Sequence, residues 1–183
     1  MRTPIFFIVA LLCGTAVFGA ALWSGNDYIF YAGYVVLHFI VLATAWNILG
    51  GYCGYVNFGS AAFFALGAYS SVVLHKTFPL PVPVLILIGG IVSGVVGLAV
   101  GYLTLRLRGV FFAIATLALA IVLQTLIVNW DYVGGSRGAY VIRPSATPYF
   151  GISYIEYLFL SMLVLAVVAI TVARSIERSQ LGY

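Results

Sequence analysis

Six long apolar segments constrain what this sequence can fold into. They cover residues 4–23, 28–50, 58–74, 84–105, 110–130 and 152–173. About 20 apolar residues cross the hydrocarbon core of a bilayer as a helix, and backbone in lipid must satisfy its own hydrogen bonds. The sequence therefore predicts an all-α, polytopic transmembrane helix bundle of about six spans, in which the segment 58–74 is short or broken.

The composition excludes several other classes of protein. Of the 183 residues, 64% are hydrophobic and only 7% are charged, against about 25% charged in a typical soluble domain. This argues against a soluble enzyme, a disordered tail and a disulfide scaffold. Arg106 and Arg108 form the densest basic cluster, so the net charge of +4 does not indicate a nucleic-acid site.

No residue pattern in the sequence points to catalysis. Cys13 and Cys53 are too few for a disulfide framework or a metal site. Phosphate-binding loops and nucleophile motifs are likewise missing from the sequence. We therefore expect a chain that is not an enzyme and binds no metal or cofactor, so that any ATP and magnesium chemistry belongs to partner subunits.

The segment 4–23 follows Arg2 and resembles a secretory signal peptide in having a basic start and an apolar core. It lacks a clean small-residue cleavage site and is long enough to span a membrane. We interpret it as a retained helix, with a cleaved signal peptide as the alternative.

Basic residues predict the orientation of the chain, because they are enriched in cytoplasmic loops. Six crossings with a cytoplasmic amino terminus place five of them inside (Arg2, Arg106, Arg108, Arg174 and Arg178) and three outside (Lys76, Arg137 and Arg143). If the segment 58–74 does not cross, the division becomes four to four. We therefore favour six crossings, with both chain ends in the cytoplasm.

Small residues mark the fourth segment as a helix that packs closely. They recur at four-residue spacing, which allows two helix backbones to approach. The set predicted to pack is Gly90, Ser93, Gly94, Gly97 and Gly101. Packing within the chain is the favoured interpretation, and a dimer interface is the alternative.

Four polar residues within or directly beside the apolar segments are candidates for a translocation path. They are Asn47, Asn57, Ser60 and Gln124. Residues 50–69 are rich in glycine, which suits either a broken helix at a binding region or a tight turn between packed helices. The four acidic residues all lie at or near segment ends, which argues against proton coupling.

Three motifs in order resemble signatures of one transporter family. Residues 46–69 read WNILGGYCGYVNFGSAAFFALGAY, residues 103–118 read LTLRLRGVFFAIATLA, and residues 129–138 read NWDYVGGSRG. These stretches are similar to the inner-membrane permeases of branched-chain amino acid ABC importers, the LivM type. The resemblance extends over roughly residues 34–183.

Membership of that family would imply a permease domain over residues 1–183 in a bacterial inner membrane. The implied partners are a second homologous permease, two cytoplasmic ATPase subunits and a periplasmic substrate-binding protein. The implied mechanism is alternating access driven by ATP. On the cytoplasmic or partner side, the candidates are Arg106, Arg108, Arg174, Arg178, Leu181 and Gly182.

The family pattern and this sequence differ in length. A motif like RSxLGY precedes the ATPase-coupling segment in the family, and here residues 178–183 read RSQLGY. We therefore expect an amino-terminal part of a permease, with the coupling segment and later spans beyond these residues. Related permeases carry urea, amides or aromatic acids, so these substrates are alternatives to a branched-chain amino acid. The alternative class of protein is a passive channel or a structural membrane subunit. No residue in the sequence decides among these.

Overall fold

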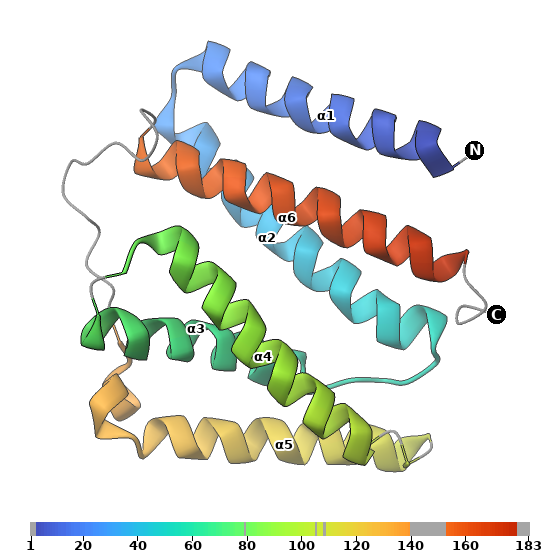
Figure 1. Ribbon diagram of the computed structural model, residues 1–183, viewed down its shortest axis with the longest axis vertical. Coiled ribbons are helices and arrows are strands. Elements are labelled where there is room, and N and C mark those ends of the chain that lie inside the picture. The colour runs from blue at the N-terminus through green and yellow to red at the C-terminus, as the bar shows by residue number, and fades with distance from the viewer. Residues whose placement is uncertain (1–2, 79, 105, 108, 140–152, 179–183) are drawn as a thin grey trace. The chain divides into compact units, whose positions relative to one another are not determined.

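The computed structural model describes residues 3–78, 80–104, 106–107, 109–139 and 153–178. Within these residues the chain forms helices and no strand, which confirms the prediction of an all-α protein (Figure 1). The chain divides into two compact units, Met1–Cys53 with Pro144–Tyr183, and Gly54–Arg143.

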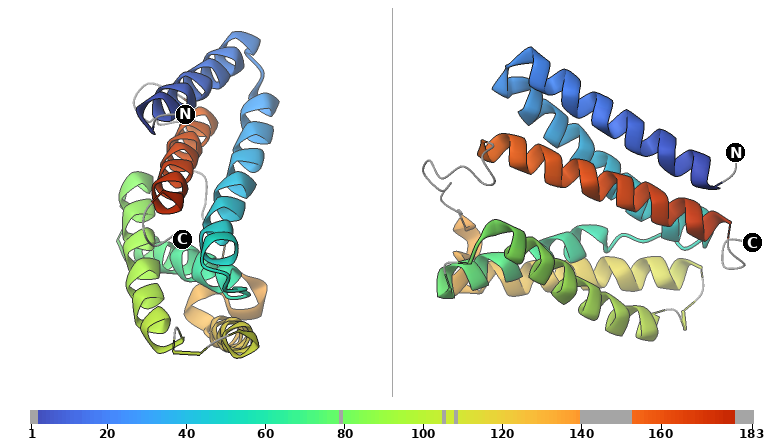
Figure 2. Two further views of the ribbon diagram at one scale, coloured as in Figure 1. Left: turned by 90° about the vertical axis from the view of Figure 1, so that its right-hand side faces the viewer. Right: turned by 45° about the horizontal axis from the view of Figure 1, so that its top comes forward.

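The first unit contains α1 (Thr3–Ser24), α2 (Asp27–Asn47) and α6 (Tyr154–Glu177). A π-helical turn, η1 (Ile48–Tyr52), continues α2. Both views in Figure 2 show α6 running beside α2, with α1 on its other flank. At the start of α6, Ser153 and Glu156 form a capping box that satisfies the first backbone N–H groups.

Phe159 of α6 forms the centre of the core of this unit. Its side chain is 1% exposed and Phe30 of α2 is 2% exposed. The two rings meet edge to face, with centroids 5.6 Å apart, and Phe18 of α1 stacks on Phe159 at 6.2 Å. Gly33 lies directly beneath the Phe159 ring, so the missing side chain at Gly33 makes room for it.

The second unit contains α3 (Ser60–Thr77), α4 (Val82–Thr104) and α5 (Val110–Val128). Two short 3-10 turns follow α5, η2 (Asp131–Val133) and η3 (Gly135–Arg137). The turns bond to the end of α3: Lys76 Nζ donates to the Tyr132 carbonyl at 2.9 Å, and the Thr77 and Tyr132 hydroxyls lie 3.0 Å apart. These contacts hold the α5 loop against α3.

Helices α3 and α4 approach each other through small residues. Ser93 Oγ donates to the Phe63 carbonyl at 2.8 Å, and Ser71 Oγ donates to the Leu85 carbonyl at 3.0 Å. Gly67 lies against Gly89. Backbones approach closely here because neither glycine carries a side chain.

The observed α4 contact uses a different set of small residues from the predicted one. Ser93 and Gly97 lie on the side of α3, near Phe63. Apart from the neighbouring residues and the backbone of α4 itself, no heavy atom of the described residues lies within 4 Å of a Cβ built at the other three, which are Gly90, Gly94 and Gly101. The close contact includes Gly89, four residues before Ser93 and so on the same face.

Four helices are long and apolar enough to cross a membrane. These are Asp27–Tyr52, Val82–Thr104, Val110–Val128 and Tyr154–Glu177, among the described residues. The described apolar stretch of α1, Leu11–Trp23, is shorter, and α3 ends in the polar residues His75 and Lys76. Six crossings therefore remain a prediction for α1 and α3.

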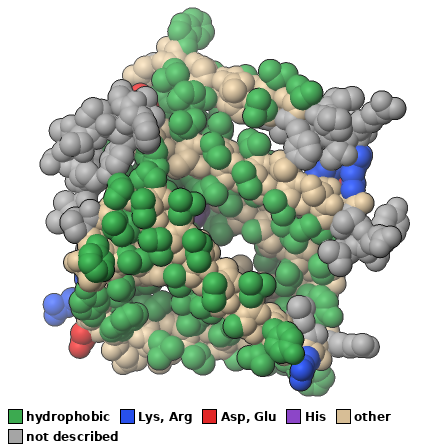
Figure 3. Space-filling model, in the orientation of Figure 1, with side chains coloured by type: hydrophobic (Ala, Val, Ile, Leu, Met, Phe, Trp, Pro, Cys, Tyr) green, Lys and Arg blue, Asp and Glu red, His purple; other side chains and the backbone are tan. Residues whose placement is uncertain are grey.

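The surface of the helices is apolar, as a membrane protein requires. Hydrophobic side chains cover the helices on the face drawn in Figure 3, and the visible charged side chains lie near helix ends. Leu98 of α4 is 77% exposed and Leu126 of α5 is 61% exposed. Exposed leucines on such apolar helices suit contact with lipid.

Candidate functional site

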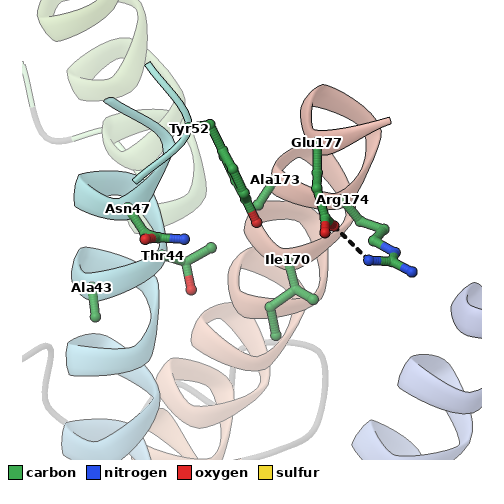
Figure 4. A pocket seen from close by; sticks show the side chains of 8 residues that line it. All are labelled: Ala43, Thr44, Asn47, Tyr52, Ile170, Ala173, Arg174 and Glu177. Atoms are coloured by element: carbon green, nitrogen blue, oxygen red, sulfur yellow. Dashed lines mark hydrogen bonds and ion pairs between the residues drawn. The ribbon is translucent and has the colours of Figure 1, made fainter. Parts of the chain in front are cut away.

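A cavity between α2 and α6 brings polar side chains together within the first unit. We call it the α2–α6 pocket; its volume is about 430 Å³, and Figure 4 shows its walls. Its lining residues are Ala43, Thr44, Asn47, Tyr52, Ile170, Ala173, Arg174 and Glu177. The side chains of Thr44, Asn47 and Tyr52 come from α2 and its π-helical turn, and face α6 across the cavity (Figure 4).

The α2–α6 pocket offers both charged and neutral hydrogen-bonding groups. Arg174 and Glu177 form an ion pair on successive turns of α6. Within the described part of the chain, no hydrogen bond involves the amide of Asn47 or the hydroxyls of Thr44 and Tyr52. These three groups are therefore available to a ligand.

The π-helical turn explains why Tyr52 reaches the pocket. The helical path of α2 widens at Ile48–Tyr52, and Gly51 lies directly against the Asn47 side chain. A side chain at Gly51 would collide with the Asn47 amide, so glycine permits this turn. Single π turns within helices are frequent at functional sites.

A second cavity lies between α3, α5 and the glycine-rich turn of the second unit. We call it the α3–α5 pocket, with a volume of about 370 Å³. Its walls are mostly small or aliphatic, namely Ala61, Ala62, Ala65, Ala120, Leu123, Ile127, Val128, Gly135 and Gly138, with Tyr69, Gln124 and Ser136 as polar members. Pockets of this kind, apolar with a few polar groups, are typical small-molecule sites.

The glycine-rich turn closes one end of the α3–α5 pocket. Gly134, Gly135 and Gly138 all have positive φ angles of 94°, 52° and 74°, which other residues rarely adopt. A Cβ at Gly135 would lie 2.9 Å from the Val128 carbonyl. Glycine thus lets the turn fold back on the end of α5, where Val133 is completely buried.

A non-helical stretch precedes α3 and lies against α5. Thr116 Oγ1 accepts a hydrogen bond from the Phe58 backbone N–H at 3.2 Å and donates to the Ala113 carbonyl at 3.0 Å. The Tyr55 ring meets Phe112 edge to face, with centroids 4.9 Å apart. Asn57 Oδ1 accepts from the Gly59 N–H at 2.7 Å, immediately before α3 begins at Ser60.

The structure separates the four predicted pathway residues. Asn47 lines the α2–α6 pocket and Gln124 lines the α3–α5 pocket. Asn57 supports the turn before α3, and Ser60 is the first residue of that helix; neither lines the two pockets. Their role in transport stays a prediction.

The predicted cytoplasmic-side residues lie at helix ends where they are described. Arg106 follows α4, and its guanidinium lies 5.5 Å from the centroid of the Tyr102 ring within that helix; Arg178 is the C-cap of α6. Arg174 belongs to the α2–α6 pocket, so the structure joins it with Asn47, which the sequence placed in a different group. Arg108, Leu181 and Gly182 lie outside the described residues.

Sequence reasoning missed Tyr52, Glu177, Thr116 and Gly89 as contributors to these sites. Tyr52 follows an apolar segment and Glu177 lies in a polar tail, so neither belongs to a helical pattern of polar residues that would indicate a pocket. Glu177 comes three positions after Arg174, a spacing at which helical side chains meet, and this could have indicated their pair. The described residues contain no group of three or more His, Cys, Asp or Glu that could hold a metal.

Comparison with known proteins identifies the family. Residues 28–183 match the family described as "Branched-chain amino acid transport system / permease component". The chain belongs to this family, a class of multi-pass membrane transport subunits.

Two curated relatives are similar to this chain. It is 27% identical over 168 residues to the high-affinity branched-chain amino acid transport system permease protein LivM of Salmonella typhimurium, and 26% identical to the LivM protein of Escherichia coli. Each alignment covers 79% of this chain and 40% of the relative. The chain thus spans about two fifths of the length of these relatives. No solved structure matches it significantly.

Proposed function

We propose that this chain is part of the membrane-spanning permease subunit of an ATP-driven importer for branched-chain or related amino acids. The observation that carries the proposal is the family match over residues 28–183, which includes the second unit, the first unit without α1, and every residue that lines the two pockets. The curated relatives are named as branched-chain amino acid permeases.

The chemistry of the two pockets supports an amino acid as the substrate. An α-amino acid carries a carboxylate and an ammonium group, and Arg174 and Glu177 of the α2–α6 pocket provide the complementary charges. The α3–α5 pocket presents alanine and aliphatic walls with Gln124, which suits an aliphatic side chain. Asn47, Gln124 and, by position, Asn57 and Ser60 are the proposed pathway residues.

The proposed mechanism is alternating access in a bacterial inner membrane, with both chain ends in the cytoplasm. The proposed partners are a homologous second permease, two ATPase subunits that bind ATP and magnesium, and a periplasmic substrate-binding protein. This chain itself neither catalyses a reaction nor binds a cofactor. Arg106, Arg108, Arg174 and Arg178, with Leu181 and Gly182, lie on the cytoplasmic or partner side in this arrangement.

Uptake of labelled leucine tests the proposed substrate class. A strain lacking the full-length permease gene should lose high-affinity leucine uptake, and the restored gene should recover it. Excess unlabelled isoleucine or valine should compete, whereas urea and benzoate should not. Loss of urea uptake with unchanged leucine uptake would overturn the substrate proposal.

A further inference from the structure

Residues 55–59 form a stretch of non-helical backbone that lies on the side of a transmembrane helix. The stretch contacts α5 at two points, through the Tyr55 ring on Phe112 and the Phe58 N–H on Thr116. Gly59 also lies close to α5, because a Cβ there would be 3.2 Å from the Thr116 carbonyl oxygen. The stretch therefore follows the first third of α5.

The position of Thr116 places this backbone inside the membrane. Helix α5 has 19 residues, which at 1.5 Å per residue is close to the ~30 Å of the hydrocarbon core. Thr116 comes six residues after Val110, the start of α5, so Phe58 lies ~9 Å along the helix. Helix α3 begins only at Ser60. The backbone that lies beside the first ~9 Å of α5 therefore has no helical hydrogen bonds.

Two residues of this stretch, Tyr55 and Val56, have backbone groups without a partner among the described residues. In the described ranges, no hydrogen bond reaches the backbone N–H or C=O of Tyr55 or Val56. An unsatisfied backbone group in lipid is strongly unfavourable, so irregular backbone at membrane depth occurs only where protein buries it or water reaches it. Gly59 is buried and Tyr55 is half-buried, whereas Val56 is 44% exposed and Phe58 is 54% exposed, so the described residues leave part of the stretch uncovered.

We propose that residues 55–59 form a wall of a water-filled path through the membrane, and that Thr116 is the residue that positions this wall. The proposal rests on the proposed transport function and adds to it the part of the chain that water and substrate pass. The exposed face of the stretch presents the backbone of Tyr55 and Val56 to water. Thr116 fixes the opposite face to α5 by accepting from Phe58.

Thr116 suits a positioning role because its hydroxyl makes two hydrogen bonds, one as donor and one as acceptor. It is 2% exposed, donates to its own helix at Ala113 and accepts from Phe58. A serine at this position keeps both hydrogen bonds. A valine has nearly the same shape but leaves the Phe58 N–H without its acceptor.

Cysteine labelling in the full-length permease within its assembled transporter tests the path. The native Cys13 and Cys53 are first replaced by alanine, and the variants Val56→Cys and Leu117→Cys are then treated with a membrane-impermeant, charged methanethiosulfonate. Leu117 is the matched control, since it is 48% exposed. It follows Thr116 directly in α5 and so lies at about the depth of the Phe58–Thr116 hydrogen bond. We expect Val56→Cys to react at least tenfold faster than Leu117→Cys.

Thr116 variants test the positioning role in the same background. Thr116→Val should change the labelling rate of Val56→Cys at least threefold and lower leucine uptake, whereas Thr116→Ser should keep both near the parent values. Equal labelling of Val56→Cys in the parent, valine and serine forms would contradict a positioning role. A purely structural loss of folded protein would lower the yield without changing the labelling rate of the folded fraction.

The labelling result is independent of the substrate. Val56→Cys reacting no faster than Leu117→Cys, in a transporter that still takes up leucine, would overturn the water-filled path alone. Rapid labelling of Val56→Cys in a transporter that does not carry leucine would leave the path standing and overturn the proposed function.

Discussion

Gly89 of α4 lies against the backbone of Gly67 of α3, so closely that a Cβ at Gly89 would be 2.7 Å from the Gly67 carbonyl oxygen. The same Cβ would lie 2.5 Å from Ser71 Oγ, whose hydroxyl bonds the Gly67 and Leu85 carbonyls at 2.9 and 3.0 Å. A backbone oxygen cannot move aside as a flexible side chain can. The closeness of α3 and α4 therefore depends on glycine at this position.

Gly89→Ala should destabilise the protein, and Gly90→Ala is the matched control. Overpacking of this kind costs about 1–3 kcal/mol, which corresponds to a fall in the thermal midpoint of at least about 2 °C. Outside the neighbouring residues and the backbone of α4 itself, no described atom lies within 4 Å of a Cβ at Gly90, and alanine is the better helix former. The midpoints are measured on the full-length permease in detergent. Equal midpoints for the two variants would contradict the close α3–α4 approach.

Phe159→Ala should destabilise the core of the first unit. The ring fills the space above Gly33 and between Phe18 and Phe30, and its loss leaves a cavity that costs about 2 kcal/mol or more. The transfer contribution is small, because lipid and detergent are as apolar as the core. Phe39→Ala, at a side chain that is 64% exposed, should change the thermal midpoint little. A comparable loss in both variants would argue against a core at Phe159.

Gln124→Leu should lower leucine uptake while the protein still assembles. The Gln124 side chain lines the α3–α5 pocket, and within the described residues its amide makes no hydrogen bond. Loss of one substrate hydrogen bond of about 1 kcal/mol is roughly a fivefold change. The adjacent Thr125→Val is the control, because the Thr125 hydroxyl bonds its own helix at Ile121. If both variants transport leucine like the parent, Gln124 does not belong to the path.

The predicted orientation places the α4–α5 loop in the cytoplasm and the turn after α5 outside. Arg106 and Arg137 are both exposed, so each position can report its side of the membrane. With the native cysteines replaced by alanine, Arg137→Cys should react with an impermeant thiol reagent in intact cells. Arg106→Cys should react only after the membrane is opened. The reverse pattern would show the opposite orientation.

The sequence predicted where the helices lie because length and apolarity decide this in a membrane. The segment 84–105 agrees closely with α4 at Val82–Thr104, and 110–130 with α5 at Val110–Val128. The predicted end of the third segment at residue 74 was too early, since α3 extends to Thr77. Lys76 and Thr77 are polar, and their contacts with Tyr132 arise only from the fold.

The sequence could not show which residues meet across helices. Glycines at 89, 90, 94, 97 and 101 have the same propensity, and only the direction of α3 selects Gly89 and Gly97 over their neighbours. Asn47 and Arg174 lie far apart in the sequence, and both line the α2–α6 pocket because α2 and α6 pack together. The sequence did not indicate the contact of Thr116 with Phe58, since the hydroxyl of a threonine within a helix usually bonds the backbone of its own helix.

The energy source for leucine uptake tests the central claim most directly. The complete transporter is reconstituted in proteoliposomes with its ATPase subunits and binding protein, and labelled leucine is supplied on the binding-protein side. With ATP and magnesium on the ATPase side, leucine should accumulate above its external concentration. Uptake should stop when the phosphate-binding lysine of the ATPase is replaced. Leucine entry that continues at the same rate without ATP, and stops at equal concentrations on both sides, would contradict the importer and indicate a passive channel.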